Sequence, residues 1–226
     1  MYRYCIKRIL DIIFSFIAII LLSPIMLLIA LLVHLKLGNP VIFKQKRPGK
    51  DEKIFLMYKF RSMTDAKDNN GNPLADEIRI TNFGKKLRSS SLDELPELFN
   101  ILRGDMSIVG PRPQLVRDMV FMTPDQRKRH TVLPGLTGLA QVNGRNNLSW
   151  EDKINYDLEY IRHLSFSTDC VIICKTLYKV IKRSDITTEG MDTAEDLGDY
   201  MLRNSMVDNE TYIKNQKLAI YLQKKK

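Results

Sequence analysis

The 226-residue sequence is poor in cysteine and histidine and lacks the common nucleotide-binding glycine motifs. Its three cysteines form neither a CxxC pair nor an even-numbered set, which argues against a disulfide framework and favours a reducing compartment. Its three histidines lack metal-ligand spacing, so a zinc site is not indicated. A Walker A loop, a GxGxxG fingerprint, the protein-kinase motifs and a nucleophile elbow are also missing, which argues against the common nucleotide-dependent enzymes and hydrolases.

Charge is absent from one long segment, Ile12 to Val33. These roughly 22 residues would form a helix of about 33 Å, which matches a hydrocarbon core of about 30 Å, so a single membrane span is the default interpretation. The run is longer than the apolar core of about 7–15 residues in a signal peptide. We therefore expect the segment to be retained in the mature protein.

Two features favour re-entry over a span. Lysines and arginines flank both ends of the run, whereas a spanning helix carries this bias on the cytoplasmic side only. Pro24 removes a backbone hydrogen bond at the midpoint, and the Ser23 hydroxyl can bond the freed carbonyls. Each half would be about 16 Å long, enough to reach mid-bilayer and return. A proline-kinked span stays open on these residues alone.

The net charge of +9 indicates an anionic partner: nucleic acid, anionic lipid or a phosphorylated substrate. No nucleic-acid-binding motif is recognisable, and a membrane segment is an unusual companion for one. We therefore expect no nucleic-acid partner and favour membrane lipids and a phosphorylated substrate.

The rest of the chain predicts an α+β fold with amphipathic helices and a small β-hairpin. Two strands are expected on either side of the turn at 47–50, and alternation along the second strand places Lys59 and Arg61 on one face. Two helices are expected between Ser149 and Arg183. The second, around Asp169 to Lys182, is typical either of a membrane-surface helix or of a core helix with a basic outer face. The division expected is a membrane unit at 1–39, a catalytic domain at 40–190 and a tail at 191–226.

Asp93-Glu94 is the first candidate site. If Ser91 caps a helix, the pair belongs to a capping box and Pro96 falls inside the helix, where it is costly. If Pro96 is instead the first helical residue, both acids lie at the helix mouth. In both arrangements the helix dipole favours an ionised carboxylate, which suits a cap and a nucleophile alike.

Cations in or beside turns and strands surround this pair in the predicted fold: Lys59, Arg61, Arg88, Arg112 and Arg145. Guanidinium groups and exposed backbone N–H groups suit a pyrophosphate. Together with the membrane segment, they indicate phosphoryl transfer to or from a lipid. The alternative is a non-catalytic basic membrane-surface scaffold or lipid-binding module.

Several ordered motifs give the sequence a specific resemblance. "YKFRSM", "SLDELPELFNIL", "VGPRP", "LPGLTGLAQVNGR" and a Tyr-Asp pair with a tyrosine three residues on resemble the monotopic phosphoglycosyl transferases, the bacterial sugar transferase family. The resemblance covers about residues 1 to 190 and includes Ser23-Pro24. The tail beyond it is not explained by these motifs.

The resemblance implies a fold and a mechanism. Its first helix would be a re-entrant helix-break-helix at Ser23-Pro24, on the cytoplasmic face of the bacterial inner membrane. Asp93 would attack the β-phosphate of a UDP-sugar, release UMP and form a covalent phosphosugar intermediate, which undecaprenyl phosphate then accepts in a ping-pong scheme. Mg²⁺ is the implied cofactor, with Asp93 as a ligand, and Glu94 would hold the metal or move a proton. The implied substrate-binding residues are Lys59, Arg88, Arg112, Gln141, Asn143 and Arg145.

Overall fold

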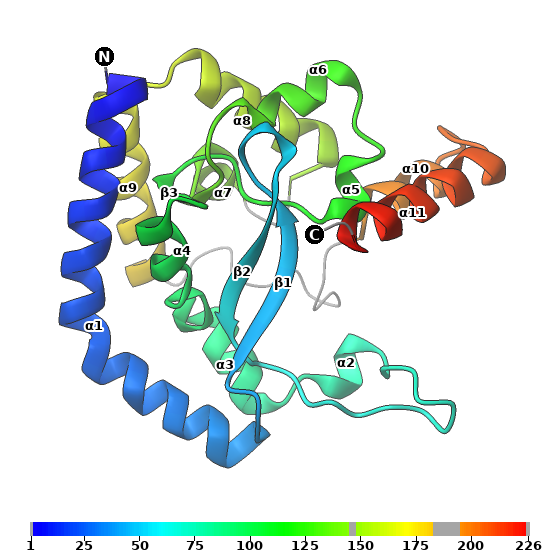
Figure 1. Ribbon diagram of the computed structural model, residues 1–226, viewed down its shortest axis with the longest axis horizontal. Coiled ribbons are helices and arrows are strands. Elements are labelled where there is room, and N and C mark those ends of the chain that lie inside the picture. The colour runs from blue at the N-terminus through cyan, green and yellow to red at the C-terminus, as the bar shows by residue number, and fades with distance from the viewer. Residues whose placement is uncertain (1, 145–147, 183–194, 225–226) are drawn as a thin grey trace.

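Two short sheets and a series of helices make up the described part of the chain, residues 2–144, 148–182 and 195–224 of a computed structural model (Figure 1). In chain order the elements are η1 (Tyr2–Ile6), α1 (Lys7–Leu37), β1 (Ile42–Pro48), η2 (Lys50–Glu52), β2 (Ile54–Phe60), α2 (Asp76–Arg79), α3 (Asn82–Ser89), η3 (Leu92–Glu94), α4 (Glu97–Arg103), β3 (Ser107–Val109), α5 (Val116–Met119), α6 (Pro124–Arg127), η4 (Lys128–Thr131), β4 (Gly135–Thr137), α7 (Leu139–Asn143), α8 (Trp150–Arg162), α9 (Phe166–Lys182), α10 (Leu197–Arg203) and α11 (Asn209–Lys224). The α+β prediction is confirmed.

The predicted hairpin is present as the antiparallel pair β1–β2. Its register joins Ile42 to Phe60 and Pro48 to Ile54, so the reversal falls on η2, slightly later than expected. Apolar residues of β2 alternate between the two faces of the pair, and Met57 and Phe60 are buried on opposite sides. The hairpin can therefore pack against α1 and still present Lys59 toward the following helices.

A second, parallel pair of strands was not predicted. β3 and β4 join Ser107 to Gly135 and Val109 to Thr137 across a crossover that contains α5 and α6. The two backbones approach so closely that a Cβ on Gly135 would lie 2.1 Å from the Gly110 nitrogen. Strands of three residues leave almost no alternation in a sequence, and the glycines read as turns.

The apolar run forms one helix, α1, that bends near its middle (Figure 1). Pro24 lies inside this helix, and the Ser23 hydroxyl donates a 2.8 Å hydrogen bond to the Ile20 carbonyl. Proline removes one backbone bond and kinks a helix without necessarily ending it. The predicted break thus takes the form of a bend within a continuous helix.

Both ends of α1 are attached to the same folded body. At the N-terminal end, Arg8 donates hydrogen bonds of 2.6 and 2.9 Å to the carbonyls of Ile101 and Leu102 at the end of α4. At the other end, Val33 is fully buried against the cluster that contains Phe60. Both ends of the helix are therefore held by one folded body.

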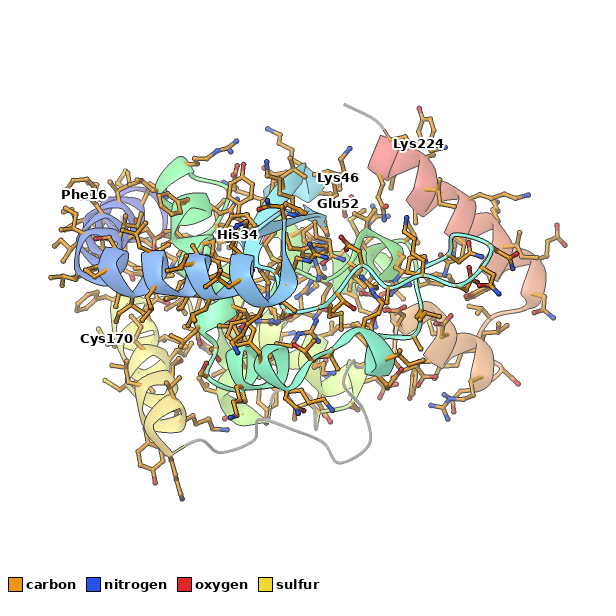
Figure 2. All side chains as sticks on the ribbon, turned by 90° about the horizontal axis from the view of Figure 1, so that it is seen from below. Phe16, His34, Lys46, Glu52, Cys170 and Lys224 are labelled. Atoms are coloured by element: carbon orange, nitrogen blue, oxygen red, sulfur yellow. The ribbon has the colours of Figure 1, made fainter. Side chains whose placement is uncertain are left out.

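Much of the apolar surface in the middle of α1 is left uncovered by that body. Leu21 and Leu27 are 71% and 72% exposed, and Phe16 lies at the outer edge of the molecule in Figure 2. The helix is long and apolar enough to cross a membrane, and only 17% of its most apolar window is buried. Exposed apolar surface of this extent is typical of contact with lipid or with another protein.

Candidate active site

The Asp93–Glu94 pair lies on η3, in a short link between two helices. α3 ends at Ser89, Ser91 adopts a left-handed conformation with φ of 56°, and Pro96 stands immediately before the first residue of α4. The Ser91 side chain makes no capping hydrogen bond, so the capping-box interpretation is wrong. The other reading is nearly right, since Pro96 precedes α4 by one position and the acids lie ahead of the helix.

Glu94 is held by two cations from distant parts of the chain. Its Oε1 accepts a 2.7 Å hydrogen bond from Lys59 Nζ on β2 and another of 2.7 Å from Arg112 Nη2, on the turn that follows β3. Burial disfavours the ionised form, but the charges of Arg112 and Lys59 outweigh it and lower the pKa of Glu94. Glu94 is therefore a fixed carboxylate.

Glu97 belongs to the same network, although sequence reasoning missed it. This side chain is almost wholly buried, and its Oε1 lies 3.2 Å from Lys59 Nζ. Burial raises the pKa of Glu97 to about 7, with Lys59 opposing and Glu94 adding to the effect. Its position one helical turn after the Asp93–Glu94 pair was the signal that could have identified it.

Asp93 differs from Glu94 in its surroundings. It is 6% exposed, and no hydrogen bond to its carboxylate is found among the described residues. Burial and then the charge of Glu94 raise the pKa of Asp93 to about 6, whereas Lys59, Arg88 and Arg112 act to lower it. Glu94 is thus held in ion pairs. The Asp93 carboxylate makes no hydrogen bond with a described residue and lies close to the charges of three cations.

Two other cations of the predicted phosphate-binding set, Arg88 and Arg61, differ in the groups that they bind. Arg88 Nε donates a 2.9 Å hydrogen bond to the Ser62 hydroxyl, which keeps its charge on the Asp93 side of α3. Arg61, predicted on the same strand face as Lys59, instead donates hydrogen bonds to the carbonyls of Met63 and Asn39. Its role is therefore structural.

The "AQVNGR" residues are not brought into contact with the carboxylates in the part of the chain that the structure describes. Gln141 and Asn143 lie on α7, where their amides donate 2.9 Å hydrogen bonds to the carbonyls of Leu136 and Leu139. Arg145 lies outside the described residues. Binding by these three residues stays a prediction.

The turn that carries Arg112 is held from behind by a buried ion pair. Arg129, 2% exposed, donates hydrogen bonds of 3.0 and 2.6 Å to Asp157 and a third, of 2.7 Å, to the Arg112 carbonyl. Arg47 donates a weaker one, 3.3 Å long, to the Pro113 carbonyl. Asp157 is the aspartate of the Tyr-Asp motif, so this motif was the sequence signal that could have identified the ion pair.

An apolar cavity of about 290 Å³ lies in the bend of α1, against the hairpin and α4. Its lining residues are Ile19, Ser23, Met26, Leu27, Ala30, Ile42, Tyr58, Phe60, Pro96 and Phe99. The two hydroxyls among them are engaged, since Ser23 bonds the Ile20 carbonyl and the Tyr58 oxygen accepts a 2.7 Å hydrogen bond from Arg103. The cavity therefore suits hydrocarbon, and Pro96 places it two residues from Glu94.

The carboxylates fit a divalent cation only as part of a shared site. No cluster of three acidic, histidine or cysteine side chains that could hold a metal occurs among the described residues. The Asp93 carboxylate makes no hydrogen bond or ion pair with a described residue, whereas Glu94 is paired. Mg²⁺ usually binds through one or two carboxylates, waters and substrate phosphates, so Asp93 together with a diphosphate is a suitable donor set.

Comparison with known proteins places the chain in a family. The model of the bacterial sugar transferase family matches residues 2–183. An uncharacterized sugar transferase of Bacillus subtilis, EpsL, is 46% identical over 189 residues, which cover 84% of this chain and 94% of that protein.

Two relatives with named activities are longer proteins. A UDP-glucose:undecaprenyl-phosphate glucose-1-phosphate transferase of Klebsiella pneumoniae is 45% identical over 76% of this chain and 39% of its own length. A UDP-N-acetylgalactosamine-undecaprenyl-phosphate N-acetylgalactosaminephosphotransferase of Aeromonas hydrophila is 40% identical over 78% of this chain and 44% of its own length. The chain thus spans about two fifths of the length of these two relatives. It belongs to the bacterial sugar transferase family.

Proposed function

We propose that this protein transfers a phosphosugar from a UDP-sugar to undecaprenyl phosphate, with release of UMP. The observation that carries the proposal is the unequal pair of carboxylates, Glu94 fixed by Lys59 and Arg112 and Asp93 without a hydrogen-bonded partner among the described residues. The names of the relatives from K. pneumoniae and A. hydrophila support these substrate classes.

In the proposed first step, an Asp93 oxygen attacks the phosphorus that carries the sugar. The bond from that phosphorus to the bridging oxygen breaks, UMP leaves with the electron pair, and an aspartyl phosphosugar forms. In this step Arg112 and Lys59 would offset the charge that develops on the diphosphate. A bound Mg²⁺, for which Asp93 is the proposed ligand, would supply further charge neutralisation at the phosphates.

In the second step, a phosphate oxygen of undecaprenyl phosphate attacks the same phosphorus. The bond to Asp93 breaks, the carboxylate is restored, and an undecaprenyl-diphosphate sugar is released. Glu94 stays ionised in this arrangement, because Arg112 and Lys59 lower its pKa. Its role is therefore to hold Lys59 and Arg112 and not to transfer a proton.

The proposed activity can be tested with a panel of UDP-sugars. The protein in detergent or nanodiscs is incubated with each UDP-sugar and undecaprenyl phosphate, and UMP and the lipid product are measured. For at least one sugar we expect about one UMP per enzyme without acceptor, and continued UMP release together with lipid product only when undecaprenyl phosphate is present. A protein that binds anionic vesicles but releases no UMP from any sugar would instead be the basic membrane-surface scaffold.

We further propose that the cavity in the bend of α1 holds the first isoprene units of the acceptor. The volume lies at the low end of small-molecule sites, which are about 300–1,000 Å³, so only part of a long chain enters. Filling the cavity with Ala30→Phe should raise the KM for undecaprenyl phosphate about 10–100-fold, because several apolar carbons lose their burial. UMP release without acceptor should not change.

Leu31→Phe is the matched control for this prediction. Leu31 is the next residue of α1, is 53% exposed and does not line the cavity. Equal KM values for undecaprenyl phosphate in the wild type and Ala30→Phe would show that the acceptor binds elsewhere.

Residues 1–39 are proposed to be a re-entrant membrane unit on the cytoplasmic face of the inner membrane, followed by a catalytic domain at 40–190. The attachment of both ends of α1 to one body supports this topology. Single-cysteine proteins that retain only Cys5, or carry only Lys44→Cys, should be labelled from the same side of inverted membrane vesicles; both positions are exposed. Labelling of the two from opposite sides would establish a span.

A further inference from the structure

The C-terminal helical pair, residues 195–224, is part of the folded core, although the family match ends at residue 183. α10 and α11 lie against α5 on the side of the molecule opposite α1 (Figure 1). Leu197 is 5% exposed in a cluster with Phe121 and Trp150, and Ala219 is 1% exposed against Val116. The pair is therefore docked through both of its helices.

One attachment is a carboxylate shared between α5 and α10. Asp118, 2% exposed, accepts a 3.0 Å hydrogen bond from the Leu115 N–H at one oxygen and another from the Leu197 N–H at the other. The second bond satisfies an N–H at the start of α10 that has no partner within the helix. Arg117 and Asp196 add an ion pair of 2.6 Å beside it. The start of α10 is thus tied to the start of α5.

The other attachment is to strand β1. Lys46 donates a hydrogen bond to the Gln223 carbonyl near the end of α11, and Figure 2 shows Lys46 on the hairpin and Lys224 at the end of that helix. The next residue of the strand, Arg47, donates to the Pro113 carbonyl directly after Arg112. α11 is therefore bonded to β1, the strand from which Arg47 supports the Arg112 turn.

Both attachments are connected to the Arg112 turn. α5 begins at Val116, shortly after this turn, and the C-terminal helical pair packs against α5. β1 contacts the turn through the hydrogen bond from Arg47 to the Pro113 carbonyl. Arg112 in turn makes the 2.7 Å bond that fixes Glu94. We infer that the C-terminal helical pair is a positioning element for Arg112, so that loss of its docking loosens the guanidinium that binds Glu94 and the substrate diphosphate. The inference rests on the proposed function for its effect on catalysis, but not for its effect on the turn.

Ala219→Glu tests this by placing a charge under α11, and Ile220→Glu is its control on the exposed face, where the side chain is 53% exposed. Hydrogen exchange followed by mass spectrometry should show faster exchange in peptides covering 110–119 for Ala219→Glu only, with peptides of β2 and α3 unchanged. Unchanged exchange in 110–119 would overturn the inference, whatever the activity of the protein.

A double-mutant cycle separates positioning from general destabilisation. In UMP release, Ala219→Glu should lower kcat/KM for the UDP-sugar about 10-fold in the wild type but less than about 2-fold when Arg112→Ala is already present. The same loss in both backgrounds would mean that the pair does not act through Arg112. Asp118→Asn, which removes one of the two shared acceptors and leaves the helix surface unchanged, repeats both measurements should Ala219→Glu fail to fold.

Discussion

Asp93→Asn should lower UMP release by about three orders of magnitude or more, because the substitution preserves shape and removes the proposed nucleophile. The loss should appear in kcat, since the cations that bind the diphosphate stay in place. UMP formed in a single turnover at saturating UDP-sugar measures it directly.

Asp125→Asn is the matched control for this experiment. Asp125 is 82% exposed at its side chain and pairs only with Lys128 among the described residues, far along the chain from the candidate site. Its rate should equal that of the wild type. An Asp93→Asn protein that released UMP at the rate of the control would remove Asp93 from the mechanism.

Lys59→Met should have the largest effect on stability. Lys59 bonds Glu94 and contacts Glu97, and its own side chain is only 16% exposed. Burial lowers the pKa of Lys59, but the two glutamates outweigh that effect and raise it, so the ammonium is firmly held. Removing it leaves two carboxylates without their shared cation, which should cost about 3–5 kcal/mol and lower the Tm in detergent by about 10 °C.

A compensated variant separates the two roles of Lys59. Lys59→Met combined with Glu97→Gln removes the carboxylate that Lys59 neutralises, while Glu94 keeps its 2.7 Å bond to Arg112. This variant should recover part of the lost Tm, yet UMP release should stay low. Lys53→Met, at an exposed lysine just before β2, should change neither quantity. If the compensated variant were as active as the wild type, Lys59 would have no part in catalysis.

Much of the site could be predicted because its residues lie in compact motifs. The proline in an uncharged run indicated the bend of α1, and the Asp93-Glu94 pair beside turn-borne cations indicated phosphate chemistry. Which of the two acids is free could not be predicted, since it depends on Lys59 and Arg112, which approach Glu94 from 35 and 18 residues away. Pairing of that kind is set by tertiary packing and leaves no local signal.

Other features could not be predicted from the sequence, for different physical reasons. β3 and β4 are too short to show alternation, and the glycines that permit their close approach imitate turns. Gln141 and Asn143 use their amides to bond carbonyls of β4 and of α7, a local use that their motif does not reveal. Two of the bonds that hold the C-terminal helices use the Leu197 N–H and the Gln223 carbonyl, and backbone groups carry no sequence signature.

The central claim is that Asp93 forms a covalent bond to the phosphosugar. Intact-protein mass spectrometry after incubation with a UDP-sugar, without acceptor lipid, tests it most directly. The account predicts a mass increase equal to one phosphosugar, lost on addition of undecaprenyl phosphate and absent from Asp93→Asn. Transfer to the lipid with UMP release only when both substrates are present, and no adduct at any time, would contradict it.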